Sequence, residues 1–181
     1  MRPDDALYAG DLEIRRHRRS DAAALNSAIL ESIDHLKPWM PWADREPLTV
    51  EDREHLIVDV FGPGWDDETD FSYGLFLDGE VVGGCGLHRR TVEGGLEIGY
   101  WTRAGHLGRG LATSAARELS AAAFRLGEIT HVEIHHDKAN VASGRVPAKL
   151  GFVLVREVRD EISAPGEVGL SCEWRLDRPS A

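Results

Sequence analysis

The sequence predicts a single α/β domain built on a mixed, mostly antiparallel sheet. Its 181 residues suit one hydrophobic core, and no linker, repeat or low-complexity tract divides them. Apolar residues recur at strand spacing in some segments and at helix spacing in others. The elements follow in the order strand, two helices, three strands, helix, strand, helix, two strands, about seven strands and four helices in all.

The first elements are a strand and a helix. Residues 12–18 alternate apolar and charged side chains, as a half-exposed strand does. Ser20 or Asp21 can cap a helix that runs to about Lys37. The inner side of this helix would carry Ala24, Leu25, Ala28, Ile29 and Ile33.

A second helix is expected after an aromatic loop at residues 35–47, which prolines interrupt. Thr49 and Asp52 have the spacing of a capping box, so this helix should begin there and continue through Val60. Glycine and proline in residues 61–70 should end it.

Three strands should follow in the middle of the sheet. Residues 71–79 and 80–90 flank Asp78-Gly79, a pair typical of the type I′ hairpin turn. Residues 95–102 form the third strand, and the longest helix spans 109–126. Gly127 should end that helix, whose inner face would carry Leu111, Ala115, Leu119, Ala122 and Leu126. The last elements are a strand at 130–136, a helix at 140–150 and strands at 152–162 and 168–176.

Composition excludes several classes of function. The chain has 21 basic and 31 acidic residues, whereas a nucleic-acid binder needs a basic face. A net charge of −10 suits a cationic substrate, although it also serves solubility alone. Two cysteines cannot build a disulfide framework or a CxxC metal site. With no signal-like or membrane-spanning segment, we expect a cytoplasmic protein that binds neither nucleic acid nor membranes.

Three glycines lie between the strand at 95–102 and the long helix. Gly105, Gly108 and Gly110 can bring the backbone close to an anion at the helix N-terminus, where free N–H groups and the helix dipole favour negative charge. The spacing fits neither a dinucleotide-binding loop nor a Walker loop. On this ground alone, a phosphate cradle and a structural turn stay equally open.

The same stretch carries a resemblance to a known family. Residues 105–110, "GHLGRG", match the loop Q/R-x-x-G-x-G/A of the GNAT-superfamily N-acetyltransferases at Gly108 and Gly110, while Gly105 departs from it. "HLKPWMPWAD", "EIGYW", "GRGLAT" and "NVASGRVPAKLGF" resemble the RimJ/RimL-like branch, which acetylates N-terminal amines of ribosomal proteins and other substrates. The resemblance covers about residues 10–176 and implies a GNAT-type sheet in one domain over 1–181.

The resemblance implies acetyl-CoA as the cosubstrate, with its pyrophosphate on the glycine loop. It also implies that the strand at 95–102 parts from the strand at 130–136 to admit pantetheine, where Gly99 would suit a bulge. A backbone N–H near Trp101 would then donate to the thioester carbonyl. The implied cofactor-binding residues are Trp101, Thr102, Arg103, His106, Leu107, Gly108, Arg109, Gly110, Leu111, Ala112, Thr113, Asn140 and Ser143.

Acetyl transfer to an amine also needs a base, and Glu97 is our candidate. A lysine amine, which titrates near 10.4, needs the base far more than an α-amine near 8. Glu97 matches the family's position for such a glutamate, although a strand glutamate can also be purely structural. Asp160 and Glu161 are weaker alternatives.

The thiolate that leaves needs a proton. Many relatives use a tyrosine at the position of Pro147, which can donate nothing, so Ser143 is the expected replacement. Asn140 lies one turn before Ser143 and can cap the helix, face the cofactor, or do both.

The acceptor cleft is expected under the aromatic loop. Trp39, Met40 and Trp42 could form its walls, although tryptophans more often pack in a core. Tyr73, His88 and Tyr100 lie on strands that border the cleft in the family.

His131, Glu133 and His135 alternate on one strand in the manner of metal ligands. Zinc deaminases with an HxE motif also need a PCxxC pair, which two isolated cysteines cannot supply. We therefore expect a polar strand face and no metal.

These features predict an acetyl-CoA-dependent N-acetyltransferase that transfers directly, since no cysteine is placed to form an acyl-enzyme. The acceptor is expected to be a peptide N-terminal α-amine. A small cationic amine and a non-catalytic acyl-CoA-binding domain are the alternatives. Relatives are often dimers, so a homodimer stays open.

Overall fold

The computed structural model describes residues 1–179 as one eight-stranded sheet in the order β1-β2-β3-β4-β5-β6-β8-β7. Neighbouring strands are antiparallel except β5 and β6, which are parallel. The strands are β1 (Ala6–Ala9), β2 (Leu12–Arg16), β3 (Asp70–Leu77), β4 (Glu80–His88), β5 (Gly95–Thr102), β6 (His131–Asp137), β7 (Val153–Arg159) and β8 (Leu170–Asp177).

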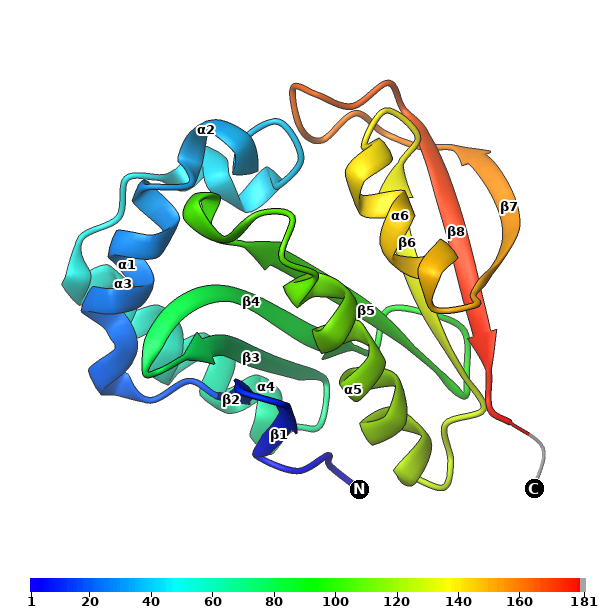
Figure 1. The fold of residues 1–181 in the computed structure, drawn as a ribbon, viewed down its shortest axis with the longest axis horizontal. Helices are drawn as coiled ribbons and strands as arrows, with labels where there is room; N and C mark the ends of the chain where they lie inside the picture. The colour runs from blue at the N-terminus through cyan, green and yellow to red at the C-terminus, as the bar shows by residue number, and fades with distance from the viewer. Residues whose placement is uncertain (180–181) are drawn as a thin grey trace.

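Helices cover both faces of this sheet (Figure 1). The long helix α5 packs on one face, and the helices of the N-terminal third cover part of the other. Helical segments are η1 (Arg19–Asp21), α1 (Ala22–Leu30), α2 (Ile33–Leu36), η2 (Pro41–Arg45), α3 (Val50–His55), η3 (Leu56–Phe61), α4 (Gly62–Asp66), η4 (Ala104–His106), α5 (Leu111–Arg125) and α6 (Val141–Lys149). Within residues 1–179, no helix is both long and apolar enough to cross a membrane.

The mixed, mostly antiparallel sheet is confirmed, with one strand more than the sequence indicated. β1 was missed because its four residues, ALYA, show no clean alternation. It forms a hairpin with β2 through Gly10, whose φ is +62°. The expected hairpin between β3 and β4 is confirmed, since Asp78 and Gly79 both have positive φ.

The single helix expected from Ser20 or Asp21 to Lys37 is wrong, because the helix breaks after Leu30. The buried Ser32 hydroxyl donates to Ala28 O at 2.6 Å and accepts the Ala104 N–H at 2.9 Å. Such a side-chain bond to the preceding turn competes with helix continuation. Asp21 does not cap the helix with its side chain, because its carboxylate pairs with Arg15.

The capping box of the second helix is confirmed, and the helical run ends within residues 61–70, as expected. Thr49 Oγ1 accepts the Asp52 N–H at 3.1 Å, and Asp52 accepts the Thr49 N–H in return. The chain stays helical to Asp66 through a widened turn and α4. Pro63 is tolerated because it lies in the first turn of α4, where a missing N–H costs nothing.

The helix α5 has the apolar face that the sequence predicted. Leu111, Ala115, Leu119 and Ala122 are all buried against the sheet. The helix ends at Arg125, two residues before Gly127, with the Leu126 N–H bonded to Ala123 O.

A buried ion pair anchors the aromatic loop. Arg53 Nη2 lies 2.6 Å from Glu46 Oε1, and both side chains are 2% exposed. Arg53 also donates to Asn26 Oδ1, and Glu46 accepts the Leu48 N–H. These bonds tie the end of the loop to α1 and α3.

We predict that Arg53→Met lowers the free energy of unfolding by about 3–5 kcal/mol, because it leaves the buried Glu46 carboxylate unpaired. Urea denaturation measures the loss. Arg53→Met with Glu46→Gln, which removes both charges, should recover part of it. A loss below about 1 kcal/mol in the single variant would contradict the pairing.

Candidate functional site

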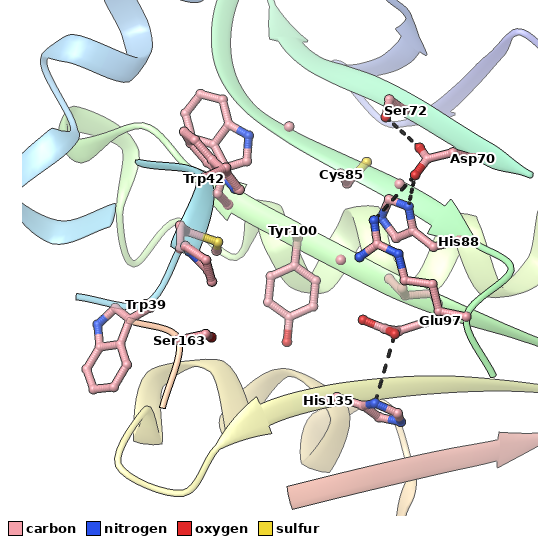
Figure 2. Close-up of a pocket in the computed structure, with 18 of the residues that line it drawn as sticks. Trp39, Trp42, Asp70, Ser72, Cys85, His88, Glu97, Tyr100, His135 and Ser163 are labelled. Carbon is pink, nitrogen blue, oxygen red and sulfur yellow. Dashed lines mark hydrogen bonds and ion pairs between the residues drawn. The ribbon is translucent and has the colours of Figure 1, made fainter. Parts of the chain in front are cut away.

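A cavity of about 920 Å³ lies between two parts of the sheet, strands β1–β5 and strands β6–β8. The aromatic loop, strands β3–β6, helix α6 and residues 160–167 contribute to its lining. Figure 2 shows Trp39 and Ser163 at one end of the cavity and His88 and Asp70 at the other. On the rim, the Gly166 N–H donates to Pro38 O at 2.8 Å and joins the β7–β8 loop to the aromatic loop.

The cavity exists because β5 and β6 separate. Their pairing covers only Gly95–Glu97 against His131–Glu133, and the rest of β5 pairs with β4 alone. The two strands converge at the lower right of Figure 1 and diverge toward the opposite end. This confirms the expected parting of the two strands. The expected bulge at Gly99 is wrong, since the register with β4 is regular from Glu97 to Thr102.

Backbone direction along β5 corrects the role expected for Trp101. The Arg103 N–H donates to Val82 O of β4, whereas Gly94 O accepts the Thr130 N–H just before β6. Peptide groups alternate sides along a strand, so those of odd-numbered residues face β4. The Trp101 N–H therefore cannot reach a carbonyl in the gap, whereas the N–H groups of Tyr100 and Thr102 are directed into it.

The glycine loop has the geometry of an anion cradle. Gly108 and Gly110 have φ of +73° and +78°, and a Cβ on either would meet no atom within 4 Å. Gly110 is the N-cap of α5 and has no side chain that could bond the N–H groups of the first turn. The N–H groups that begin α5 at Leu111, Ala112 and Thr113 thus face an open, glycine-lined approach.

Charges around the loop differ from expectation at one position. The Arg103 guanidinium pairs with Glu31 at 2.6 Å and Glu80 at 2.7 Å, so it is not free to bind phosphate. Arg109 is exposed and makes no ion pair within residues 1–179. His106 is largely buried with its Nδ1 unpartnered, Leu107 is exposed, and Leu111 packs into the core.

Glu97 lies at the point where the strands part. It is the last residue of β5 that pairs with β6, and it lines the cavity with its side chain 21% exposed. Its Oε2 is 3.9 Å from His135 Nδ1 on β6. Asp160 and Glu161 also line the cavity, from the loop after β7.

On the other face of β5, Tyr100 contacts Ser143 of α6. Pro147 has no N–H to bond the carbonyl of Ser143 four residues earlier. The Tyr100 hydroxyl donates to that carbonyl at 3.0 Å and lies 3.2 Å from Ser143 Oγ. Burial raises the pKa of Tyr100 to about 12, so the phenol stays protonated at neutral pH. Asn140 caps α6 as expected, its Oδ1 accepting the Ser143 N–H.

The aromatic loop lines the cavity as expected. Trp39, Met40 and Trp42 all contribute, and Trp42 packs edge-on against Trp101 with ring centroids 6.3 Å apart. Trp101 therefore belongs to this wall through its side chain.

Two strand residues expected at the acceptor site have different surroundings. Tyr73 also reaches the cavity lining, but it is 1% exposed and its hydroxyl donates to Asp4 O, so its contact with a substrate stays a prediction. His88 does line the cavity, with Nδ1 2.7 Å from Asp70 Oδ2. Burial opposes ionisation of Asp70, but the bond and charge of His88 hold the pKa of that carboxyl below its usual value.

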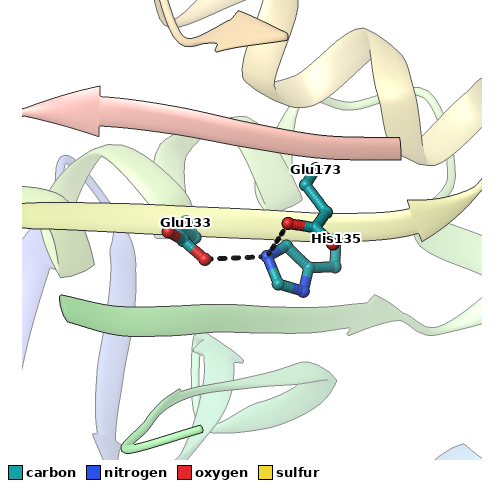
Figure 3. Close-up of side chains that lie close together, drawn as sticks. All are labelled: Glu133, His135 and Glu173. Carbon is teal, nitrogen blue, oxygen red and sulfur yellow. Dashed lines mark hydrogen bonds and ion pairs between the residues drawn. The ribbon is translucent and has the colours of Figure 1, made fainter. Parts of the chain in front are cut away.

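The polar face of β6 forms a compact cluster with β8. Glu133, His135 and Glu173 bring one ligand-type atom each within 4.8 Å of the others (Figure 3). His135 Nε2 is 2.9 Å from Glu133 Oε2, while Glu173 pairs with Arg156 at 2.6 Å. These pairings satisfy the three side chains within the protein. The sequence placed Glu133 and His135 on one strand, but it did not reveal that Glu173 of β8 lies beside them.

Comparison with known proteins points to one family. The model of the acetyltransferase (GNAT) domain matches residues 11–153. The candidate ribosomal N-acetyltransferase YdaF of Bacillus subtilis (strain 168) is 30% identical over 156 residues, which are 86% of this chain and 85% of YdaF.

Solved structures share the fold. A crystal structure of a probable acetyltransferase is 28% identical, with a TM-score of 0.86 and coverage of 96% of this chain and 97% of that one. RimL, a ribosomal L7/L12 α-N-protein acetyltransferase in complex with CoA, is 19% identical, with a TM-score of 0.84 over 93% of this chain and 95% of that one.

We predict that Gly108→Val weakens acetyl-CoA binding roughly tenfold or more, a loss of about 1.4 kcal/mol, because the side chain enters the approach to the α5 N-terminus. Isothermal titration calorimetry measures it. Gly10→Val is the matched control, since Gly10 also has positive φ and open space but lies in the β1–β2 hairpin. Both variants should lose stability, and equal acetyl-CoA affinities would disprove the cradle.

Proposed function

The chain belongs to the GNAT acetyltransferase family, and from this premise we propose that it transfers the acetyl group of acetyl-CoA directly to the α-amine of a peptide N-terminus. The observation that carries the proposal is the gap between β5 and β6, with Glu97 on one face and the Tyr100–Ser143 pair on the other. A glycine-lined helix N-terminus lies at the end of β5.

The gap and the loop would bind the two ends of the cofactor. The pyrophosphate would accept N–H groups at the start of α5, and pantetheine would extend between β5 and β6. The Tyr100 N–H, directed into the gap, would donate to the thioester carbonyl as its oxygen gains charge. A donor held in place by the sheet needs no reorganisation during the reaction.

Proton transfers would divide between the two faces of β5. Glu97 would receive the incoming ammonium group and take its proton, directly or through water. Tyr100 would donate a proton to the leaving thiolate. Ser143 Oγ, which lies 3.2 Å from the Tyr100 hydroxyl, would then replace the proton on Tyr100. Ser143 thus keeps the role expected from the sequence but shares it with Tyr100.

Several features support a peptide α-amine as the acceptor. An α-amine titrates near 8 and a lysine near 10.4, so much more of the α-amine is already deprotonated at neutral pH and its proton is easier to remove. Glu97, Asp160, Glu161 and Glu167 make parts of the cavity wall acidic, which suits a cationic N-terminus. The similar protein RimL is a ribosomal L7/L12 α-N-protein acetyltransferase. The same acidic wall would also attract a small cationic amine, which is the alternative acceptor.

We predict CoA release from acetyl-CoA with free-N-terminus peptides, measured by thiol detection. The panel pairs each peptide with its N-acetylated copy and adds free lysine, polyamines and aminoglycosides. The blocked peptides should give none. Release only with the small amines would contradict a peptide acceptor and favour a small cationic amine.

Glu97→Gln tests whether the domain is catalytic. The substitution keeps the size of the side chain, so acetyl-CoA binding should persist while turnover falls by about 10²–10⁴-fold. Binding of acetyl-CoA without turnover of any amine by the unaltered protein would instead favour a non-catalytic acyl-CoA-binding domain.

A further inference from the structure

His135 and Glu97 face each other across the opening of the sheet. β5 and β6 pair as far as Glu97 and Glu133, and His135 is two residues further along β6. Both side chains line the cavity, with Glu97 Oε2 3.9 Å from His135 Nδ1 (Figure 2). They therefore flank the place where the amine and the thioester would meet.

Glu133 determines which nitrogen of His135 is free. Glu133 Oε2 lies 2.9 Å from His135 Nε2 (Figure 3), whereas Glu97 approaches the other nitrogen, Nδ1. An ionised carboxylate only accepts hydrogen bonds, so Nε2 carries the hydrogen. In the neutral ring the lone pair is then on Nδ1, which faces Glu97 and the cavity.

Further charged and titratable groups lie close to Glu133 and to the ring. The other oxygen of Glu133, Oε1, is 3.3 Å from Nε2 of the buried His131. Glu173 Oε2 of β8 is 4.0 Å from His135 Nε2, but Arg156 of β7 pairs with it at 2.6 Å. The imidazole thus faces three carboxylates, Glu97, Glu133 and Glu173, and one of them is neutralised by an arginine.

We propose that His135 is the proton-accepting partner of Glu97, and that Glu133 is the residue that positions it. The proposal rests on the proposed acetyl transfer. A carboxylate is in general a much weaker base than an amine, and an imidazole is intermediate between the two, so a histidine beside the carboxylate eases removal of the proton.

The acceptor ammonium gives one proton to Glu97, which passes it to His135 Nδ1 through a water that bridges the 3.9 Å between the two side chains. The freed nitrogen lone pair forms the bond to the acyl carbon, and the C–S bond breaks with its electron pair on sulfur. The Tyr100–Ser143 pair gives a proton to the thiolate, and the second proton of the nitrogen replaces it on that pair, which gives the amide and the CoA thiol. The imidazolium, stabilised by Glu97 and Glu133, returns its proton to water.

The test compares pH profiles of kcat/KM for acetyl-CoA and the most active peptide of the panel. The unaltered protein should show a rise in the imidazole range. His135→Gln should lose that rise and at least about tenfold in kcat, with acetyl-CoA affinity unchanged. Glu133→Gln should move the rise to lower pH, because the lost carboxylate favoured the charged ring. Glu133→Asp keeps a carboxylate and should shift the rise less than Glu133→Gln does. His55→Gln, an exposed histidine outside the cavity, should match the unaltered protein.

If His135→Gln leaves the pH profile and kcat unchanged while Glu97→Gln loses turnover, the proposed role of His135 is overturned and the proposed acetyl transfer is not. A second measurement uses the unaltered protein and requires no turnover. NMR of ¹⁵N-histidine-labelled protein at high pH should show His135 with hydrogen on Nε2 and none on Nδ1. The opposite tautomer would overturn the proposal even in a protein that acetylates no amine of the panel.

Discussion

Parallel pairing between β5 and β6 stops after three residue pairs, and the functional geometry depends on that limit. Those pairs hold the two parts of the sheet together, while beyond them β5 pairs with β4 and β6 pairs with β8. Each strand therefore keeps one ladder complete and offers unpaired peptide groups to the gap. Backbone N–H groups that lack a partner are costly to bury, so an open edge of this kind calls for a ligand or water. A pantetheine arm, with its own amide groups, suits such an edge.

Strand alternation then separates the chemistry into two sides. Glu97 and Trp101 project to the face with the aromatic loop, whereas Tyr100 projects toward α6. A base on one face and hydroxyl groups on the other let the amine approach from one side while the thiol leaves on the other. Pro147 contributes because the Ser143 carbonyl that it leaves unbonded becomes the acceptor for Tyr100. The proline at the position where relatives have a tyrosine thus helps to place a tyrosine from the neighbouring strand.

The sequence predicted the sheet class, most of the element order, the β3–β4 hairpin, the caps at Thr49 and Asn140, and the glycine loop. These are local patterns in which one residue type at one spacing has a strong preference, as with Asp78-Gly79 or Thr49 with Asp52. It failed where a distant contact decides. Ser32 breaks the first helix by bonding Ala104, and Arg103 is taken by Glu31 and Glu80, partners far away in sequence. The direction of the Trp101 N–H was not predicted, because resemblance locates a strand near a site but does not say which way each peptide group points.

The most direct measurement of the central claim is a crystal structure of the protein grown with acetyl-CoA. The account predicts pantetheine between β5 and β6, the pyrophosphate against the N–H groups at the start of α5, and the thioester carbonyl within hydrogen-bond distance of the Tyr100 N–H. Acetyl-CoA bound elsewhere, or its carbonyl bonded to a donor on the β4 side of β5, would contradict it.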